Sequence, residues 1–348
     1  MKILKLTNKL NLPAPIYHAA QFDEYDDGGA DISVTRLIQP PRMVALKQKY
    51  GDKLELDAAD QIWLVMGKAL HKVLEWGREI DNNDAHEYEV RKAKEMRGWV
   101  LSGAADFIDH ERKVIVDFKF TKSLPFFKAR RGEKPEWEAQ LNILRWLFDL
   151  PDYDMQIVTI IKDYEEHRAA IDSEYPNHPV ATVDVRKWDF DEVERYVEER
   201  IIMHQEAQQA LDLGDPIPEC TPEDRWARPK QYRLKAPGMK RSKRTTEDLA
   251  QLIEWALTNP KRAKYKYLTP DGKFYRGYGI YEADPDPYYR CRKHCLVAKF
   301  CDQYQKRLKE EQEYGIKLNS IRRLEIDIEG LIKEMESDNA GTEGADGK

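Results

Sequence analysis

The stretch with the clearest chemical potential is 103–120, GAADFIDHERKVIVDFKF, which sets carboxylates and a lysine among apolar residues. If its second half is a strand, Asp117 and Lys119 project from one face, about 6.5 to 7 Å apart, because side chains alternate along a strand. Asp and Lys are common on exposed strands, but the run VIVDF indicates burial, where they are rare unless paired or ligating. The pattern therefore favours a paired acid and base inside the fold.

A second carboxylate, Asp106, lies in the first half of the same stretch. The polar tetrad 109–112 separates two strand-like runs and predicts a hairpin, so Asp106 should fall opposite residue 116 or 117, at ~4.5 to 5.5 Å. Two carboxylates this close repel each other unless a proton or a divalent cation lies between them, and oxygen ligands favour Mg²⁺ or Mn²⁺. With Lys119 to orient the attacking water, the arrangement suits phosphodiester hydrolysis.

A histidine could complete the metal shell. Apolar residues recur at three- and four-residue steps from Asp60 to about Ile80, as an amphipathic helix requires. His71 and Gly67 lie beside that stripe, so His71 could offer an imidazole nitrogen while Gly67 allows the helix to approach the sheet closely. A single histidine is more often a core or surface residue than a ligand, so the assignment of His71 as a metal ligand depends on the carboxylates of the expected hairpin. The stripe consists of Ile62, Met66, Ala69, Leu70, Val73 and Leu74.

Gln140 lies next to the apolar face of a second expected helix, from Glu136 to Leu150. Its amide can hold a phosphate or a water molecule without adding charge, although a plain helix-surface role is the commoner one for such a residue. Other carboxylates could also ligate a metal, but a solvated helix face or loop explains them equally well. These are Glu75, Glu87 and Glu89.

Four short motifs follow one another in this part of the chain: GKALH (67–71), GAADFID (103–109), VIVDFK (114–119) and QLNILRW (140–146). In type and order they resemble the PD-(D/E)XK nucleases of the RecB-like exonuclease group, which includes CRISPR-associated exonucleases and many phage-encoded relatives. The resemblance covers roughly residues 30–150, and the cysteines extend it to about 305. One departure is Leu144, which stands where a tyrosine often follows the glutamine of the last motif.

The resemblance implies a catalytic set of five residues. Its metal ligands would be His71, Asp106 and Asp117. Lys119 would be the catalytic lysine, and Gln140 the glutamine of the last motif. Because these residues are the ones that the hairpin and the two helices single out, the resemblance and the bottom-up chemistry predict the same site.

The four cysteines are clustered. Cys291, Cys295 and Cys301 fall within eleven residues, and the fourth is Cys220. In a reducing compartment such clustering is typical of a metal or cluster site, with four buried free thiols as the plainer alternative. Thiolates select zinc or iron–sulfur, and spacing alone does not separate the two. The resemblance favours a [4Fe-4S] cluster, which would close the insert 221–290, although in those relatives the lone cysteine usually precedes the nuclease motifs.

Positive charge is concentrated in residues 224–285, which hold 15 Lys and Arg against 7 Asp and Glu. Aromatic residues are interleaved with them, and cations for phosphates beside rings for base stacking are typical of single-strand binding. A solvated basic surface explains the pattern about equally well. The candidate nucleic-acid-binding residues are Lys240, Arg241, Lys243 and Arg244. The rings are Trp226, Tyr232, Tyr265, Tyr267, Phe274, Tyr275 and Tyr278.

Composition bounds the class of protein. The chain has 348 residues, 41% hydrophobic and 34% charged, with a net charge of -6, so global charge neither favours nor opposes a nucleic-acid partner. No apolar run approaches the ~18 to 20 residues of a membrane helix, and the first twenty residues lack an apolar signal core. We therefore expect a cytoplasmic protein, in the host cytoplasm if phage-encoded, with no membrane partner.

The expected elements run helix, hairpin, helix, strand, strand, helix over residues 60–213. This order predicts an α/β or α+β fold with a central mixed sheet flanked by helices, which agrees with the restriction-endonuclease-like core that the resemblance implies. We expect a nuclease core at 1–215 and a basic insert closed by four cysteines at 216–305. A charged helix at 306–336 and a disordered tail at 337–348 should complete the chain.

Together these features predict a DNA exonuclease that depends on Mg²⁺ or Mn²⁺ and acts on single strands or DNA ends in recombination, repair or phage DNA processing. A recombination or single-strand-binding protein would be a second partner. Two alternatives stay open: an endonuclease of the same fold, and a catalytically silent DNA-binding module stapled by the cysteine site, with zinc in place of iron–sulfur. Retention of all five catalytic residue types argues against the silent module.

Overall fold

The computed structural model describes most of the chain in two compact units, which we call unit 1 (Met1–Glu219) and unit 2 (Cys220–Lys348). In the described part of the chain, no helix combines the length and the apolar character that crossing a bilayer requires. The described residues are 5–22, 28–236, 238–239, 241–258, 267–268, 273–274, 278–313, 321–324 and 330.

Unit 1 is built on a six-stranded mixed sheet. Its strands are β2 (Ile32–Ser33), β4 (His86–Met96), β5 (Trp99–Asp109), β6 (Val114–Thr121), β7 (Asp154–Ile161) and β8 (Val180–Asp184). They follow the order β2-β5-β6-β7-β8, with β4 paired to β5. The pairs β2–β5 and β6–β7 are parallel, whereas β4–β5, β5–β6 and β7–β8 are antiparallel. The expected mixed sheet is therefore confirmed, and β4 is a strand that the sequence patterns did not predict.

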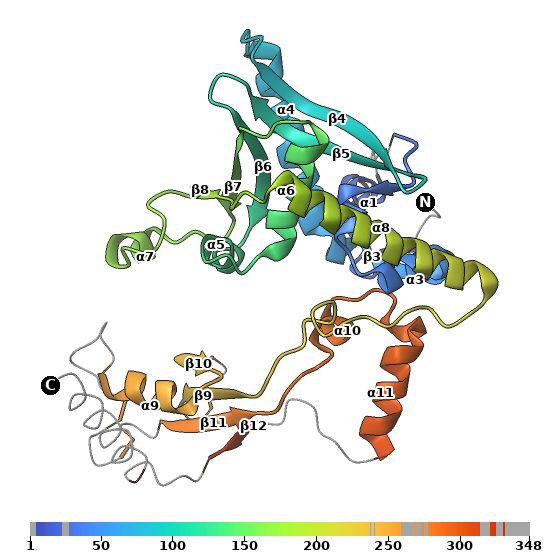
Figure 1. The fold of residues 1–348 in the computed structure, drawn as a ribbon. Helices are drawn as coiled ribbons and strands as arrows, with labels where there is room; N and C mark the ends of the chain where they lie inside the picture. The colour runs from blue at the N-terminus through green and yellow to red at the C-terminus, as the bar shows by residue number, and fades with distance from the viewer. Residues whose placement is uncertain are drawn as a thin grey trace, which may run out of the picture. The chain divides into compact units, whose positions relative to one another are not determined.

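Helices flank this sheet, as expected for the mixed α/β class (Figure 1). They are α1 (Ala14–Gln21), α2 (Val34–Leu37), α3 (Pro41–Tyr50), α4 (Ile62–Ile80), α5 (Ser123–Arg130), α6 (Pro135–Leu147), α7 (Glu166–Ile171) and α8 (Phe190–Leu213). A separate parallel pair joins β1 (Lys5–Thr7) to β3 (Glu55–Asp57). The buried face of α8 continues from Ile201 through His204 and Ala207, because a helix advances 3.6 residues per turn.

Close packing of β5 against α6 depends on Gly103. A Cβ at this position would lie 2.6 Å from Cδ2 of Leu144 and 2.8 Å from Cγ2 of Val34, so no side chain fits without displacement. Leu144 is itself 2% exposed. The residue that stands in place of the tyrosine of the family pattern is therefore a core residue, buried where it contacts no ligand at the surface.

Unit 2 contains a small antiparallel sheet in the order β10-β9-β11-β12. Its strands are β9 (Gln231–Lys235), β10 (Arg244–Thr246), β11 (Gly279–Ala283) and β12 (Ile321–Arg323). Its helices are α9 (Leu249–Thr258), α10 (Tyr289–Lys293) and α11 (Asp302–Glu313). Side chains of the sheet and of α9, together with Leu268, form a separate core: Leu234, Leu252, Ile253, Ala256, Leu268 and Ile280.

The single charged helix expected at 306–336 is wrong in its extent. Helix α11 ends at Glu313, and Ile321–Arg323 form strand β12 beside β11. Arg322 lies opposite Glu282 in that pairing, and their side chains form an ion pair of 2.6 Å. An alternation of charges fits an exposed edge strand as well as a helix, and pairing with β11 decides between them. The expected tail at 337–348 lies outside the described residues.

Candidate functional site

The two strands of the central hairpin separate at the predicted acidic pair. The ladder between β5 and β6 ends at Phe107 and Val116, after which β5 continues beside β4 and β6 continues beside β7. The next facing positions in this register are Asp106 and Asp117. The expected hairpin is thus confirmed with Asp106 opposite residue 117, and both acids lie where the sheet forks.

The carboxylate of Asp106 takes the place of a main-chain acceptor at this fork. One of its oxygens accepts a hydrogen bond of 2.8 Å from the N–H of Phe118 on β6. Burial is the main reason that the pKa of Asp106 is raised to about 7, and the nearby carboxylate of Asp117 raises it further. Such a rise is what two carboxylates show when they share a site without a cation between them.

Asp117, Lys119 and Gln140 form one hydrogen-bonded cluster. The Lys119 Nζ lies 2.8 Å from Oδ1 and 2.7 Å from Oδ2 of Asp117. From helix α6, Gln140 donates through Nε2 to Asp117 Oδ1 at 3.2 Å and accepts from Lys119 Nζ at 3.4 Å. Asp117 is 3% exposed, and its Oδ2, although beside the ammonium, has no aligned hydrogen bond. A buried carboxylate oxygen in this state has spare capacity for a cation.

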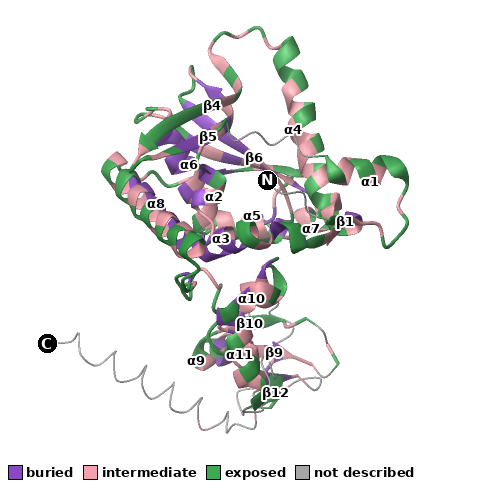
Figure 2. Cartoon of the chain, turned by 90° about the vertical axis from the view of Figure 1, so that its right-hand side faces the viewer, coloured by how far each residue is buried: buried purple, intermediate pink, exposed green. Residues whose placement is uncertain are grey.

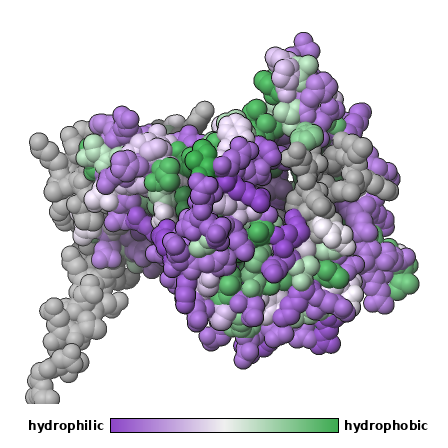
Figure 3. Space-filling view, turned by 90° about the horizontal axis from the view of Figure 1, so that it is seen from above, coloured by the Kyte–Doolittle hydropathy of each residue, from purple (hydrophilic) through white to green (hydrophobic). Residues whose placement is uncertain are grey.

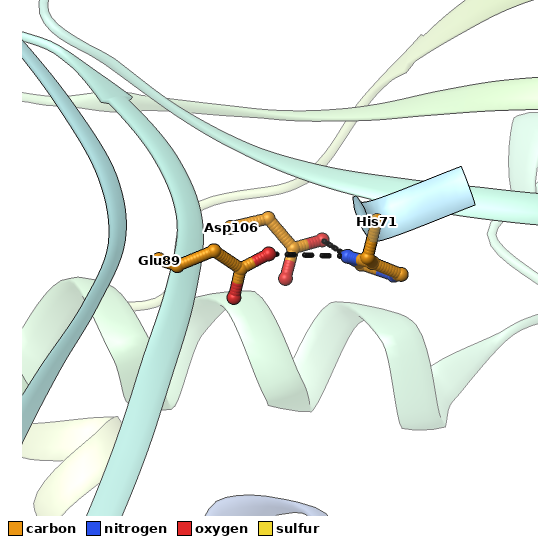
Figure 4. Close-up of side chains that lie close together, drawn as sticks. All are labelled: His71, Glu89 and Asp106. Carbon is orange, nitrogen blue, oxygen red and sulfur yellow. Dashed lines mark hydrogen bonds and ion pairs between the residues drawn. The ribbon is translucent and has the colours of Figure 1, made fainter. Parts of the chain in front are cut away.

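A second group of side chains that could bind a metal ion lies beside this cluster (Figure 4). His71 Nδ1 lies 3.2 Å from Glu89 Oε1 and 3.9 Å from Asp106 Oδ2, and one ligand atom from each of the three lies within 4.8 Å of the others. The residues come from three successive elements, α4, β4 and β5, which meet here. One imidazole and two carboxylates are a donor set that suits Mn²⁺ or Mg²⁺.

Glu89 reaches this set through an unusual backbone conformation. Its φ is +49°, although the ladder with β5 is regular one residue before it and one residue after it. The left-handed region costs a residue with a side chain on the order of 1 to 2 kcal/mol. From the sequence, Glu89 is only one of three open candidates for a metal ligand, because the strand that carries it was not predicted. A strand beside Asp106 would have been the signal that separates it from Glu75 and Glu87.

Helix α4 carries His71 as expected, but its glycine and its apolar stripe do not act as expected. A Cβ on Gly67 would meet nothing within 4 Å, so this glycine does not serve a close approach to the sheet. Met66 and Val73 of the stripe are 43% and 51% exposed, and no residue of α4 is buried. The helix contacts β6, β4 and α1, and it meets the sheet through the side that carries His71.

Metal-free protein is expected to lose stability as the pH rises from about 4 to about 8. The pKa of Asp106 is about 7 in the fold and 3.8 as a free side chain. Asp106 therefore contributes roughly 2 to 4 kcal/mol to the free energy of unfolding below pH ~4, and this contribution is lost as the pH rises past ~7. The pKa of His71 is also raised, first by its hydrogen bond to Glu89, which acts in the same direction above pH ~6.5.

Urea denaturation of metal-free protein at pH 5 and pH 8, with and without Mn²⁺, measures this dependence. Because these ligands must lose their protons to bind a metal, Mn²⁺ should stabilise the protein more at pH 8 than at pH 5. The matched variant Asp106→Asn should reduce both effects. An equal effect of Mn²⁺ at the two pH values would contradict the assignment.

The three clustered cysteines of unit 2 lie close together. Burial raises the pKa of the Cys291 thiol to about 12, and the neighbouring Cys295 and Cys301 thiols add to the rise. Cys220 is tied to the same region, because its N–H donates to Oε1 of Gln303 at 3.0 Å and its carbonyl accepts from Nε2 at 3.1 Å. Gln303 stands two residues after Cys301, so the lone cysteine lies beside the segment that holds the cluster.

The basic run is partly described. Arg241, Lys243 and Arg244 are exposed, and the Arg244 guanidinium lies 5.7 Å from the centre of the Trp255 ring. Lys240 lies outside the described residues. The described part of the run therefore presents its charges to solvent, as a phosphate-binding surface requires.

Most of the rings interleaved with these charges have a structural role. Trp226 is 37% exposed, and the Arg290 guanidinium lies over its ring at 4.7 Å. Tyr265 and Tyr275 lie outside the described residues. The rings that pack against the core of unit 2 are Tyr232, Tyr267, Phe274 and Tyr278.

Comparison with known proteins gives only distant likenesses. No protein-family model matches the chain, and no curated protein matches it. The crystal structure of a protein named SSO0001 is similar over 54% of this chain and 82% of that one, with 21% identity and a TM-score of 0.34. A phage-related exonuclease from Haemophilus somnus 129PT is similar over 58% and 87%, with 17% identity and a TM-score of 0.33. The function proposed below rests on the geometry of the site.

Proposed function

We propose that this protein is a divalent-metal-dependent nuclease of the PD-(D/E)XK type, which hydrolyses phosphodiester bonds of DNA. The observation that carries the proposal is the meeting of two groups at one fork of the sheet. One is the buried cluster of Asp117, Lys119 and Gln140, and the other is the set formed by His71, Glu89 and Asp106. A purely structural ion pair would require neither the second carboxylate nor the histidine beside it.

The residues at the fork fit a divalent cation. The Asp117 Oδ2 is buried without an aligned hydrogen bond, and the pKa of Asp106 is raised first by burial and then by the nearby Asp117 carboxylate, although His71 and Lys119 partly offset the rise. His71, Asp106 and Asp117 would hold the ion, with Glu89 as an added ligand. A bound Mg²⁺ or Mn²⁺ would polarise a phosphate oxygen and lower the pKa of a bound water.

Lys119 is held in position by two partners. An ammonium has three donors, and two of those of Lys119 go to Asp117 and Gln140. The third is available to the attacking water or to a phosphate oxygen that gains charge in the transition state. Gln140 ties this lysine to Asp117, so its role is to fix the ammonium at the site and to offer an amide to the phosphate.

We also propose that unit 2 binds a [4Fe-4S] cluster through Cys220, Cys291, Cys295 and Cys301, and that its basic run contacts DNA. The hydrogen bonds between Cys220 and Gln303 support the first part, because they tie the lone cysteine to a residue two positions after Cys301. Such a site would stabilise unit 2, since metal binding adds directly to folding free energy. Action on DNA ends or single strands, in recombination, repair or phage DNA processing, is part of the same proposal.

The test of this function is a cleavage assay on end-labelled linear and on circular single-stranded DNA, with and without Mn²⁺. Loss of the linear substrate alone, only with metal, would support a metal-dependent exonuclease. Cutting of the circle would show an endonuclease of the same site. Protein that binds DNA but cleaves neither substrate with either metal would overturn the enzymatic proposal in favour of a silent binding module.

Glu89 is expected to contribute more to metal affinity than to the stability of the metal-free fold at pH 8, where less of the stabilisation from its hydrogen bond to His71 remains. Glu89→Gln should weaken Mn²⁺ binding by tenfold or more, since it removes one charged ligand. Glu89→Gly should weaken binding as much, while the metal-free protein keeps its stability to within about 1 kcal/mol, because glycine adopts a positive φ without strain. Titration calorimetry with Mn²⁺ and urea denaturation measure the two effects.

The matched control is Glu87→Gln, which alters an exposed carboxylate two residues away on the same strand. This variant should bind Mn²⁺ like the parent. If Glu89→Gln and Glu87→Gln bind the ion equally well, Glu89 is not a ligand.

Neutralising the basic run is expected to weaken single-stranded DNA binding and to flatten its salt dependence. Replacing Lys240, Arg241, Lys243 and Arg244 by glutamine removes up to four phosphate contacts, so the slope of log K against log salt should fall by up to about 3. Fluorescence anisotropy at several salt concentrations measures it. An equal number of exposed lysines of unit 1 provides the control: Lys5, Lys9, Lys49 and Lys53. If the slope of log K against log salt is the same in the two quadruple variants, the basic run is a solvated surface that does not contact DNA.

A further inference from the structure

Helix α4 has an apolar surface that the described residues of unit 1 do not cover. Its 19 residues include none that is buried, and Figure 2 shows it exposed or half-buried along its whole length. Hydrophobic side chains reach the surface in patches between polar ones on the face seen in Figure 3. A helix that positions a candidate metal ligand on one side thus leaves its other side to solvent.

Five exposed apolar residues of α4 form one line, which we call the α4 stripe: Met66, Ala69, Val73, Trp76 and Ile80. Trp63 and Leu64, in the first turn of the helix, are exposed as well. They follow one another at steps of three, four, three and four residues, which is the spacing of a helix-pairing seam. Val73, Trp76 and Ile80 are 51%, 56% and 78% exposed. Contiguous apolar surface of this kind is unusual on a monomer and marks an interaction site.

The α4 stripe lies on the opposite side of the helix from the candidate site. Leu70, His71 and Leu74 are half-buried, and they fall on the side through which α4 contacts β4 and β6. Covering the stripe would therefore leave His71 in place. An occupant of this surface can be tested by measurements that do not depend on nuclease activity.

The charges beside the stripe favour a second copy of this chain as the occupant. Lys68, Lys72, Glu75 and Glu79 follow one another at steps of four, three and four residues, so they form a parallel line with two cations first and two anions last. In an antiparallel helix pair, the cationic half of one line faces the anionic half of the other. Within the chain Lys72 and Glu75 lie 2.7 Å apart, at 60% and 36% side-chain exposure, and Lys68 donates to the main-chain oxygen of Phe22 at 2.6 Å, so a second copy would share these charges with contacts inside one chain.

A lipid surface fits these observations less well. Helices that lie on anionic membranes carry cations along the whole polar border of the apolar face. Here Glu75 and Glu79 occupy half of that border, which opposes an anionic bilayer but matches a second α4. We therefore infer that two copies of this protein pair through antiparallel α4 helices, with the α4 stripe at the centre of the interface and the Lys–Glu lines on its rim.

Sedimentation velocity on the full chain over a hundredfold range of concentration tests this inference. A one-helix interface is at the small end of dimer interfaces, so we expect a reversible dimer with a micromolar dissociation constant. Trp76→Glu should shift it to monomer, and Val73→Ser, a milder change, should weaken it by tenfold or more. A monomer at every concentration would overturn the inference, whatever the nuclease assays show.

Charge reversal distinguishes an antiparallel pair of copies from any other occupant. Two double variants should each be monomeric: Lys68→Glu/Lys72→Glu and Glu75→Lys/Glu79→Lys. In each of them all four side chains of the line have charges of the same sign, so two copies repel each other. Mixed in equal amounts, they should form a heterodimer. Self-association that is unchanged in both variants, or no association on mixing, would overturn the antiparallel arrangement. Binding of monomeric parent protein to vesicles of anionic lipid would assign the stripe to a membrane surface instead.

Discussion

Replacing Asp117 by asparagine is expected to lower the rate of DNA cleavage by roughly 10²- to 10⁴-fold while DNA binding and the fold persist. Asparagine has the same shape and still accepts from Lys119 and Gln140, so the cluster should stay assembled. It lacks the charge that would hold a divalent cation. Single-turnover cleavage with Mn²⁺, together with anisotropy for DNA binding, separates the two effects.

Asp154→Asn is the matched control for this change. Asp154 begins the neighbouring strand β7 and forms an exposed ion pair of 2.6 Å with Lys187, which should contribute less than about 1 kcal/mol. Its cleavage rate should equal that of the parent. Cleavage by Asp117→Asn within tenfold of the parent would contradict the proposed site.

Lys119→Met provides a second view of the same cluster. Residues that act as a unit have strongly non-additive effects on rate, so the double variant with Asp117→Asn should be about as slow as the slower single variant. Multiplicative losses would mean that the ammonium and the carboxylate act independently. That outcome would be inconsistent with distances of 2.7 and 2.8 Å between them.

Replacing Cys291 by serine is expected to remove the bound cluster and to destabilise unit 2 by several kcal/mol. The pKa of this thiol is raised to about 12 without metal, so its thiolate exists in the fold only when a cation compensates the burial. Because binding free energy at a structural metal site is folding free energy, loss of one ligand should lower the unfolding temperature of unit 2. Metal analysis, visible absorption and calorimetry of anaerobically purified protein measure these changes.

His294→Ala is the control for the cysteine variant. His294 is adjacent to Cys295 and packs against the rings of Trp226 and Tyr289, yet four thiolates leave no need for a fifth ligand. This variant should keep its metal and most of its stability. A colourless parent protein with stoichiometric zinc would show that the four cysteines form a structural zinc site and not an iron–sulfur cluster. A parent without metal, with Cys291→Ser equally stable, would contradict the site altogether.

The two sets of experiments should be independent of each other. The residues of the candidate metal centre belong to unit 1, whereas all four cysteines belong to unit 2. Cys291→Ser should therefore leave the affinity of unit 1 for Mn²⁺ unchanged, and Asp117→Asn should leave the cysteine site intact. A change of DNA affinity in Cys291→Ser would connect the cysteine site to the basic run of the same unit.

Local patterns alone predicted much of this fold. Alternation along 114–121 and the tetrad 109–112 predict a hairpin, and the hairpin narrows the residue opposite Asp106 to 116 or 117; the register of the structure decides for 117. Helical spacing likewise places His71 and Gln140 on helices next to apolar faces. These predictions needed only neighbours along the chain, because strand and helix periods are properties of short segments.

Three features were decided only by tertiary structure. Glu89 joins His71 and Asp106 because β4 pairs with β5, and pairing between strands depends on partners that no local pattern identifies. Residues 321–323 form a strand rather than a helix because β11 is there to pair with them. The α4 stripe has the spacing of a buried helix face, and yet its residues are exposed. Periodicity determines that such a face exists, whereas the packing of the whole chain decides what covers it.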